Sequence, residues 1–530
     1  MVLKKSTKII SAIVVIAIVL GLVVSVTADR PWTSYGYDWF NETYPVQSGY
    51  VVDRIITSSE LGLTTPMRSP RDVFVYESGD EVSIFIVDAD NDRIIITDEN
   101  FEDVRELKTF EYSDDYKVEN FLPRPDVSGN IAPDDVDAYW AEVGKIGTQT
   151  TLRGPTGIFV QNFRGETRVY IADHHNERVI ACDLDGKIWM EYRRPDPESF
   201  DPNASFRPSK VLADAAGNVY VCLTTITQGA VVFNEDGGFR GFYGANRVIQ
   251  GATARLNYFL RFFMSREMMA RRVRPTPIEF SNFTIDNDQF IYTVTETRGE
   301  NVGIVKKINP SGQDVFSEEG KDDWIWGAFM SPYVYGRTFM SMMVDISVDE
   351  KGDIYLLDRE SGQVFQYDKE GYLMFVFGGK GEQKGLFTAP VSVETHNGKV
   401  YVLDSTKNSL TVFKPTEFGE LVLEAMSLFN RGLYEESMKP WEEVLKRDAN
   451  YYMAYNGMGN AKLSVGDFDE ALSYFYLHSS FGYQRAFKDF RIHYMRENFN
   501  RILAVAVAAV ALIAVTHFTI KFIRKRKAKS

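Results

Sequence analysis

Six repeated segments of the sequence each place one residue two positions after their first residue, or at the equivalent point, and most of these residues could do chemistry. These six residues are Asp72, Gly157, Lys210, Asn282, Asp345 and Ser392. Two carboxylates, an amide and an ammonium could bind a polar solute or an ion if the fold brings them together. The alternative is an internal ring of ion pairs and hydrogen bonds. We favour this ring, because the Lys210 ammonium would repel a divalent cation.

Motifs of common enzymes offer no competing site. No Ser-His-Asp, HExxH, Walker or Rossmann pattern occurs in a suitable context. His174 and His175 form the most conspicuous histidine motif, and we favour a surface turn over a metal pair because adjacent residues at a strand end point apart. The sequence therefore predicts no catalytic residue, no cofactor and no metal ligand set.

The elements that carry these residues form a repeat. Its copies begin at Pro70, Pro155, Pro208, near Ser281, at Val344 and at Pro390. Period-two alternation between Gly, Asp and Asn turns is typical of short antiparallel strands. Six copies, none able to bury its faces alone, predict a mostly β, six-bladed β-propeller over residues 29–418. We expect the strand at 50–56 to complete the last blade, because the residues that follow this strand are similar to the residues that precede the sixth copy.

Two turns of the repeat share the pattern Asp-x-x-Asn-x-Arg-Ile/Val, beginning at Asp88 and Asp173. Turns at Asp358 and Asp404 match it in part. The repeats resemble the NHL family over about residues 50–414, which implies a propeller of NHL type. We expect the Asp and Asn side chains to accept backbone N–H bonds and to adopt the left-handed conformations of the turn, so their role is structural.

A helical segment is expected at 419–500. The run GNAKLSVGDFDEALSYF at 459–475 resembles a tetratricopeptide repeat (TPR), and related residues recur 34 positions earlier, which is the period of that family. The resemblance implies two repeats, capped by an amphipathic helix at about 483–499. The helices are expected to pair through small residues, at Ala425 or Gly459 and at Ser437 or Ala471.

Apolar segments near both ends indicate a membrane. Residues 1–28 are either a cleaved signal peptide or a membrane helix, and both interpretations stay open. Residues 501–521 are long and apolar enough to cross a hydrocarbon core of about 30 Å. The tail at 522–530 should stay cytoplasmic and contact anionic lipid through basic residues that include Arg524, Lys525, Arg526 and Lys527. We expect a single- or double-pass protein of the cell membrane, with most of the chain extracytoplasmic.

A basic segment at 251–274 interrupts the repeat. It combines apolar residues at helical spacing with arginines, in a chain of net charge −14. Such a helix could dock on a membrane surface or on a partner, or it could pack on the propeller with its arginines paired to local acids. The candidate docking residues are Phe259, Arg261, Phe263, Arg266, Arg271 and Arg272.

Composition excludes several classes of protein. Hydrophobic residues at 44% and charged residues at 25% exclude a disordered chain and a polytopic membrane protein. The acidic net charge makes nucleic acid a poor partner. Cys182 and Cys222 are too few for a disulfide framework, and both lie in apolar runs, so buried free thiols are favoured over a bridge between them.

These features predict a membrane-anchored, outward-facing scaffold. The layout resembles NHL-propeller and TPR membrane proteins of Gram-positive bacteria that occur near carbohydrate ABC-transport systems. This resemblance implies membrane-protein partners, ABC-transporter components among them, and carbohydrate as a ligand class.

The alternative function is an extracellular, metal-dependent, lactonase-like hydrolase that uses Asp72, Asn282 and Asp345. Thr156 and Ser209 stand where gluconolactonase-like propellers carry metal ligands, so that ligand set is not matched. A Lys210 ammonium paired with both aspartates would argue against the hydrolase.

Overall fold

A computed structural model of the chain describes residues 31–37, 42–79, 81–114, 116, 146–195, 200, 205–224, 229–244, 280–296, 303–318, 324, 326–328, 333–334, 337–338, 341–478 and 480–527. Two predicted segments, residues 1–28 and 251–274, lie outside these ranges, and so do the six candidate docking residues of the latter. The chain divides into two compact units. The first comprises Met1–Ser34 and Ser48–Thr416, and the second comprises Tyr35–Gln47 and Glu417–Ser530.

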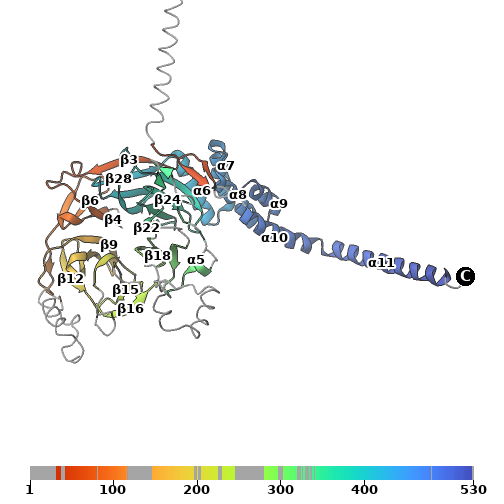
Figure 1. The fold of residues 1–530 in the computed structure, drawn as a ribbon, viewed down its shortest axis with the longest axis horizontal. Coiled ribbons are helices and arrows are strands. Elements are labelled where there is room, and N and C mark those ends of the chain that lie inside the picture. The colour runs from red at the N-terminus through yellow and green to blue at the C-terminus, as the bar shows by residue number, and fades with distance from the viewer. Residues whose placement is uncertain are drawn as a thin grey trace, which may run out of the picture. The chain divides into compact units, whose positions relative to one another are not determined.

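The first unit is a six-bladed β-propeller, which confirms the predicted fold (Figure 1). Blade 1 contains β4 (Pro70–Ser78), β5 (Glu81–Asp88), β6 (Arg93–Asp98) and β7 (Val104–Leu107). Blade 2 contains β9 (Pro155–Phe163), β10 (Glu166–Asp173), β11 (Arg178–Cys182) and β12 (Lys187–Tyr192), and β8 (Glu111–Tyr112) pairs in parallel with β12. Blade 3 contains β13 (Pro208–Ala213), β14 (Val219–Leu223), β15 (Ala230–Phe233) and β16 (Phe239–Tyr243).

The remaining blades complete the ring. Blade 4 contains β17 (Asn282–Ile285), β18 (Ile291–Val294) and β19 (Val305–Ile308) among the described residues, followed by the short helix α5 (Val315–Glu318) and the hairpin of β20 (Tyr333–Val334) and β21 (Arg337–Thr338). Blade 5 contains β22 (Met343–Val348), β23 (Ile354–Asp358), β24 (Gln363–Tyr367) and β25 (Leu373–Gly378). Blade 6 contains β26 (Pro390–His396), β27 (Lys399–Asp404), β28 (Ser409–Pro415) and β3 (Tyr50–Thr57).

The N-terminal strand closes the ring as predicted. β3 pairs antiparallel with β28, from Tyr50 opposite Pro415 to Thr57 opposite Ser409. Blade 6 therefore takes its outer strand from the N-terminal side of the propeller and its other three strands from the C-terminal side. This pairing joins the first and last strands of the propeller within one blade and closes the ring.

Apolar side chains between neighbouring blades form the core. One cluster packs Phe85 and Val87 of blade 1 against Ile158 and Ile171 of blade 2. A second cluster packs Tyr170 of blade 2 against strands of blade 3. Neighbouring blades thus bury their faces against one another, so the repeat is stable as a ring and not as single sheets.

The Asp-x-x-Asn-x-Arg turns are structural, in a more specific way than predicted. Asp88 accepts the backbone N–H of Arg68, as expected, but Asn91 donates its side-chain amide to Asp88. The left-handed residue is Asp92, which follows the Asn, at φ 52°. The Asp173 turn repeats this arrangement. In these two turns the expectation that the Asn accepts backbone N–H bonds and adopts the left-handed conformation is therefore wrong.

The arginine of each turn holds the blade together. Arg93 is fully buried and donates to Asp88 at 2.7 Å and to Glu106 of the outermost strand at 2.8 Å. Arg178 pairs in the same way with Asp173, at 2.8 Å, and with Glu191. Both arginines lie 13 residues before their glutamate, a spacing that could have identified the pair from the sequence.

The second unit is helical. It contains α6 (Glu417–Asn430), α7 (Tyr434–Arg447), α8 (Tyr452–Ser464), α9 (Phe468–His478) and α10 (Ser480–Glu497). Gly459 of α8 allows close packing with α9, because a Cβ atom there would lie 2.8 Å from the Phe475 ring. Ala425, Ser437 and Ala471 are all buried, so the predicted small residues lie at helix contacts.

A hairpin from the N-terminal region belongs to the helical unit. Its strands are β1 (Tyr35–Tyr37) and β2 (Thr43–Pro45). The Tyr44 ring lies 4.4 Å from that of Tyr452, and the backbone N–H of Gln47 donates to Asp448 at 2.7 Å. These contacts place Tyr35–Gln47 with the helices, whereas the sequence analysis assigned it to the propeller.

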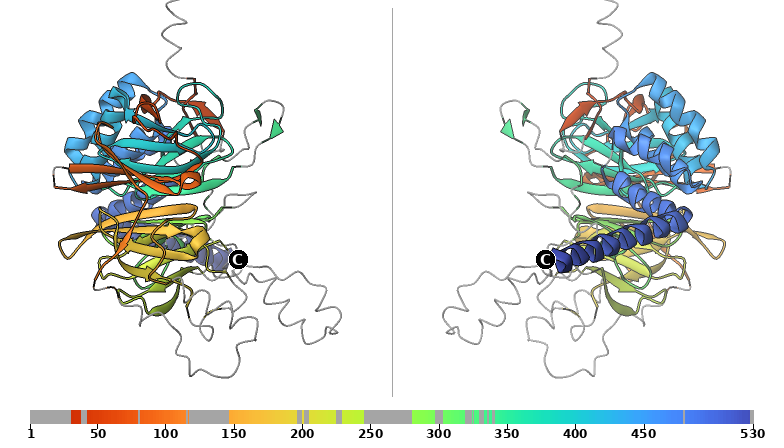
Figure 2. Two further views of the ribbon diagram at one scale, coloured as in Figure 1. Left: turned by 90° about the vertical axis from the view of Figure 1, so that its left-hand side faces the viewer. Right: turned by 90° about the vertical axis from the view of Figure 1, so that its right-hand side faces the viewer.

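The last helix, α11 (Phe499–Lys527), follows α10 and extends to the C-terminal end as a single rod (Figure 2). Phe499–Lys521 is the one stretch of the described residues that is long and apolar enough to cross a membrane, with a mean hydropathy of 2.4 and no part buried. This agrees with the predicted span. Arg524, Lys525, Arg526 and Lys527 occupy the final turn of the helix beyond it.

Candidate functional site

The innermost strands of the six blades surround the propeller axis. Each of β4, β9, β13, β17, β22 and β26 contacts the innermost strand of the next blade, and β26 contacts β4. The six residues singled out in the sequence all lie in the first half of these strands. The repeat therefore brings Asp72, Lys210, Asn282, Asp345 and Ser392 together around the axis, and we call these five residues the axial ring.

Lys210 is the centre of the axial ring. Its Nζ lies 2.6 Å from Oδ1 of Asp72 and 3.9 Å from Oδ1 of Asp345. Lys210 comes from blade 3, and the two aspartates come from blades 1 and 5. One ammonium thus pairs with a carboxylate from each of two other blades, which is the arrangement that argues against a divalent metal between them.

The two aspartates are saturated by further bonds from neighbouring blades. Asp72 accepts the backbone N–H of Ile158 in blade 2 at 2.9 Å and the hydroxyl of Ser392 in blade 6 at 2.9 Å. Asp345 accepts the side-chain amide of Asn282 in blade 4 at 2.5 Å and the backbone N–H of Val393 in blade 6 at 2.7 Å. Every blade is therefore connected to the axial ring by at least one polar contact.

Gly157, the sixth equivalent position, contributes space instead of a polar group. A Cβ atom there would lie 2.8 Å from the carbonyl oxygen of Ser209 and 2.9 Å from Cα of Lys210. Both contacts are with the backbone of β13, which cannot rotate away. Glycine at this position lets β9 and β13 approach and brings Lys210 to the axis.

Burial and charge shift the pKa values of the axial ring in opposite directions. Burial raises the pKa of Asp345 to about 6, although Lys210 opposes the rise. Burial alone would lower the pKa of Lys210, but Asp345 and Asp72 raise it above its usual value. The ammonium of Lys210 is therefore a permanent charge at physiological pH.

Glu394 is a neighbour of the axial ring that the sequence analysis missed. Burial raises its pKa well above the usual value, and Lys210 opposes this shift. Glu394 lies two residues after Ser392 on β26, so the alternation of a strand could have assigned both residues to one face. Together with Lys210, Phe74, Phe159 and Phe283, it lines a cavity of about 10 Å³, which has room for about one water molecule.

A second charged cluster lies at the far ends of the innermost strands. Nδ1 of His396 is 3.5 Å from Glu350, and Nε2 is 3.9 Å from Glu77. Hydrogen bonding with Glu350 raises the pKa of His396, and the charges of Glu77 and Glu99 act in the same direction. These residues, the His396 cluster, join blades 1, 5 and 6.

The other candidate ligands do not assemble. Within the described part of the chain, no three His, Cys, Asp or Glu side chains are grouped so that they could hold a metal ion. Nδ1 of His174 donates to the carbonyl oxygen of Pro208 at 2.9 Å, and the His174 ring packs edge-on against that of His175. Cys182 and Cys222 are buried and form no disulfide with each other, and burial raises the pKa of the Cys182 thiol.

The sequence matches no protein-family model and no curated protein sequence. Several solved structures match the chain at low similarity. Virginiamycin B lyase from Staphylococcus aureus is 12% identical, with a TM-score of 0.36, over 68% of this chain and 98% of that one. A luciferin-regenerating enzyme is 10% identical, with a TM-score of 0.36, over 69% and 95%. A DUF4221 family member from Bacteroides vulgatus is 9% identical, with a TM-score of 0.37, over 70% and 99%. Identities this low carry no information about ligand or reaction.

Proposed function

We propose that the chain is a membrane-anchored binding scaffold, in which the propeller supplies a rigid interaction surface and the axial ring holds the blades together. The observation that carries this proposal is the pairing of the Lys210 ammonium with Asp72 and Asp345. Ion pairs and hydrogen bonds within the protein use the polar groups that a channel enzyme would need for its substrate or metal. The axis thus contributes rigidity, and binding is left to the outer surface.

The membrane anchor is the second part of the proposal. The apolar span Phe499–Lys521, followed by basic residues, supports an orientation with the C-terminal tail in the cytoplasm and the propeller outside. Residues 1–28 would then be a signal peptide or a second span. The NHL-like turns and the TPR-like helix pairs favour protein partners, and membrane proteins such as carbohydrate ABC-transporter components fit this location.

The alternative of a metal-dependent, lactonase-like hydrolase has less support. It would use Asp72, Asn282 and Asp345 as ligands, but the nearest cation to both carboxylates is Lys210, and Asn282 already donates to Asp345. A divalent ion would have to displace a charge that is covalently part of the chain.

Crosslinking of the full chain in its own cells tests the proposal. The detergent-solubilised protein is captured, its partners are identified by mass spectrometry, and bound metals are measured on the same sample. A matched control replaces residues 499–521 with an unrelated membrane span, so that partners retained by both proteins are recruited by the outward-facing part. A reproducible membrane-protein partner retained by the control supports the scaffold. One divalent ion per chain, lost in Asp72→Asn, together with no partner, would instead support the hydrolase.

A further inference from the structure

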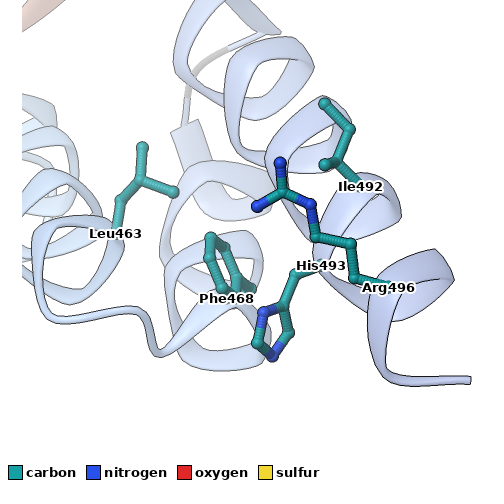
Figure 3. Close-up of a pocket in the computed structure, with 5 residues that line it drawn as sticks. All are labelled: Leu463, Phe468, Ile492, His493 and Arg496. Carbon is teal, nitrogen blue, oxygen red and sulfur yellow. The ribbon is translucent and has the colours of Figure 1, made fainter.

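A groove lies in the helical unit, and Figure 3 shows the side chains that line it. Its volume is about 330 Å³, and it is lined by Leu463 of α8, Phe468 of α9, and Ile492, His493 and Arg496 of α10. The Phe468 ring lies 4.8 Å from that of His493. The groove therefore has apolar walls from three helices, and its cationic group is on α10.

Arg496 supplies a positive charge that no neighbouring acid neutralises. Among the described residues, no carboxylate lies within ion-pair distance of Arg496, whereas His493 pairs with Glu497 at 3.3 Å and Lys462 pairs with Glu470 at 2.5 Å. In Figure 3 the guanidinium extends over the groove toward Leu463 and Phe468. A guanidinium beside apolar side chains can bind the phosphate of a molecule whose remaining part is apolar.

The position of Arg496 along the chain matches the depth of lipid phosphates. The backbone N–H of Asn498 donates to Tyr494, and that of Ile502 donates to Asn498, so helical hydrogen bonds continue from α10 into α11. Arg496 lies three residues before Phe499, where the span begins, which is about 4.5 Å at the rise of an α-helix. The headgroup layer is roughly 5–7 Å thick on each side of the hydrocarbon core.

Exposed aromatic residues lie near Arg496, at the same depth relative to the candidate span. Tyr494, whose ring stacks on that of Phe490, and Phe499 are both more than half exposed. Aromatic side chains at this depth are typical of membrane interfaces. Their exposure agrees with a bilayer, and not water, around the junction of α10 and α11.

We propose that the groove binds one phospholipid of the leaflet that α11 enters. Arg496 holds the phosphate, and Leu463, Phe468 and Ile492 contact the glycerol and the upper part of an acyl chain. The inference rests on the proposed membrane anchoring and adds a specific lipid site to it. A bound lipid would fix α10 against α8 and α9 at the membrane surface.

Lipid titration of the full chain tests this site. The protein is delipidated in detergent, and phosphatidylglycerol is added while native mass spectrometry counts bound lipids. We expect saturation at one lipid, with an affinity about tenfold weaker in Arg496→Gln, the loss typical of one charge-assisted hydrogen bond. Arg491→Gln, which removes an exposed arginine of the same helix, is the matched control and should bind like the wild type.

Three outcomes would overturn the lipid site: equal affinity in Arg496→Gln and wild type, binding that does not saturate at one lipid, or displacement of the lipid by millimolar inorganic phosphate. The last outcome would assign the site to a soluble phosphate. Flotation of the full chain with liposomes keeps the two proposals apart. A chain that does not float refutes the anchor, whereas a chain that floats but shows one of the three outcomes refutes only the lipid site.

Discussion

Replacement of Lys210 by methionine tests the axial ring directly. Methionine fills a similar volume but leaves Asp72 and Asp345, both about 1% exposed, without their shared counter-ion. Removal of one partner from a buried ion pair costs about 3–5 kcal/mol. For the roughly 370 residues of the propeller, an unfolding entropy of about 2.1 cal/mol/K per residue converts this cost into a fall in Tm of about 4–6 °C.

The cost should depend on pH with a definite sign. In the wild type, Asp345 has a pKa of about 6 and is ionised at pH 8 but largely protonated at pH 5, so at pH 5 the substitution removes the counter-ion of less buried negative charge. We therefore expect a larger loss of Tm at pH 8 than at pH 5. Adding Asp72→Asn to Lys210→Met should recover part of the loss, since a neutral amide needs no counter-ion.

Thermal unfolding of the detergent-solubilised full chain, followed by intrinsic tryptophan fluorescence, measures these shifts. Lys187→Met is the matched control, because Lys187 is exposed on β12 and makes no ion pair among the described residues. A Lys210→Met protein within 1 °C of the wild type at pH 8, or one that loses more Tm at pH 5, would show that the axial ring is not an ion-paired structural element.

Three further predictions test other parts of the structure. Gly157→Ala should lower stability by about 1–3 kcal/mol in chemical denaturation, because its Cβ would meet β13 backbone, whereas Gly379→Ala meets only a movable leucine side chain and should cost less. His396→Gln should lower Tm at pH 6 but not at pH 9, since stability from a raised histidine pKa is complete below about 6.5 and is lost as pH rises through the folded-state value; an equal loss at both pH values would contradict this. A cysteine that replaces exposed Lys384 should react with an impermeant maleimide on intact cells, and a cysteine that replaces Arg524 should not. The natural thiols are buried and should not react themselves. The reverse labelling pattern would invert the proposed topology.

The repeat made most of the propeller predictable. Strand alternation and equivalent positions in six copies were sufficient to predict the blades, the closing strand β3 and the residues that meet at the axis. These features depend on period and register, which a sequence displays directly. The charge types at the axis also allowed an internal ion-pair ring to be preferred over a metal site.

Features that depend on contacts between distant segments were not predictable. The two-residue strand β8 joins blade 2 through a parallel pairing, and the hairpin Tyr35–Gln47 joins the helices through one aromatic contact and one hydrogen bond. Neither segment has a periodic pattern. Arg93 and Arg178 were recognised as motif residues, but their burial against a glutamate of the outermost strand became visible only when all four strands were in place.

Closure of the ring by β3 has a mechanical consequence. Tyr50 and Pro415 face each other at one end of the β3–β28 ladder, so the chain enters and leaves the propeller at the same point. A force that separates residues 48 and 416 would load this ladder from its end and break its hydrogen bonds one after another, as in opening a zipper. The fate of residues 1–28 then decides whether the propeller can ever carry such a load. If they are cleaved, the chain has one tether and no tension can develop across the ring, whereas two retained membrane helices would load first the contacts of the hairpin Tyr35–Gln47 with the helices and then the β3–β28 ladder.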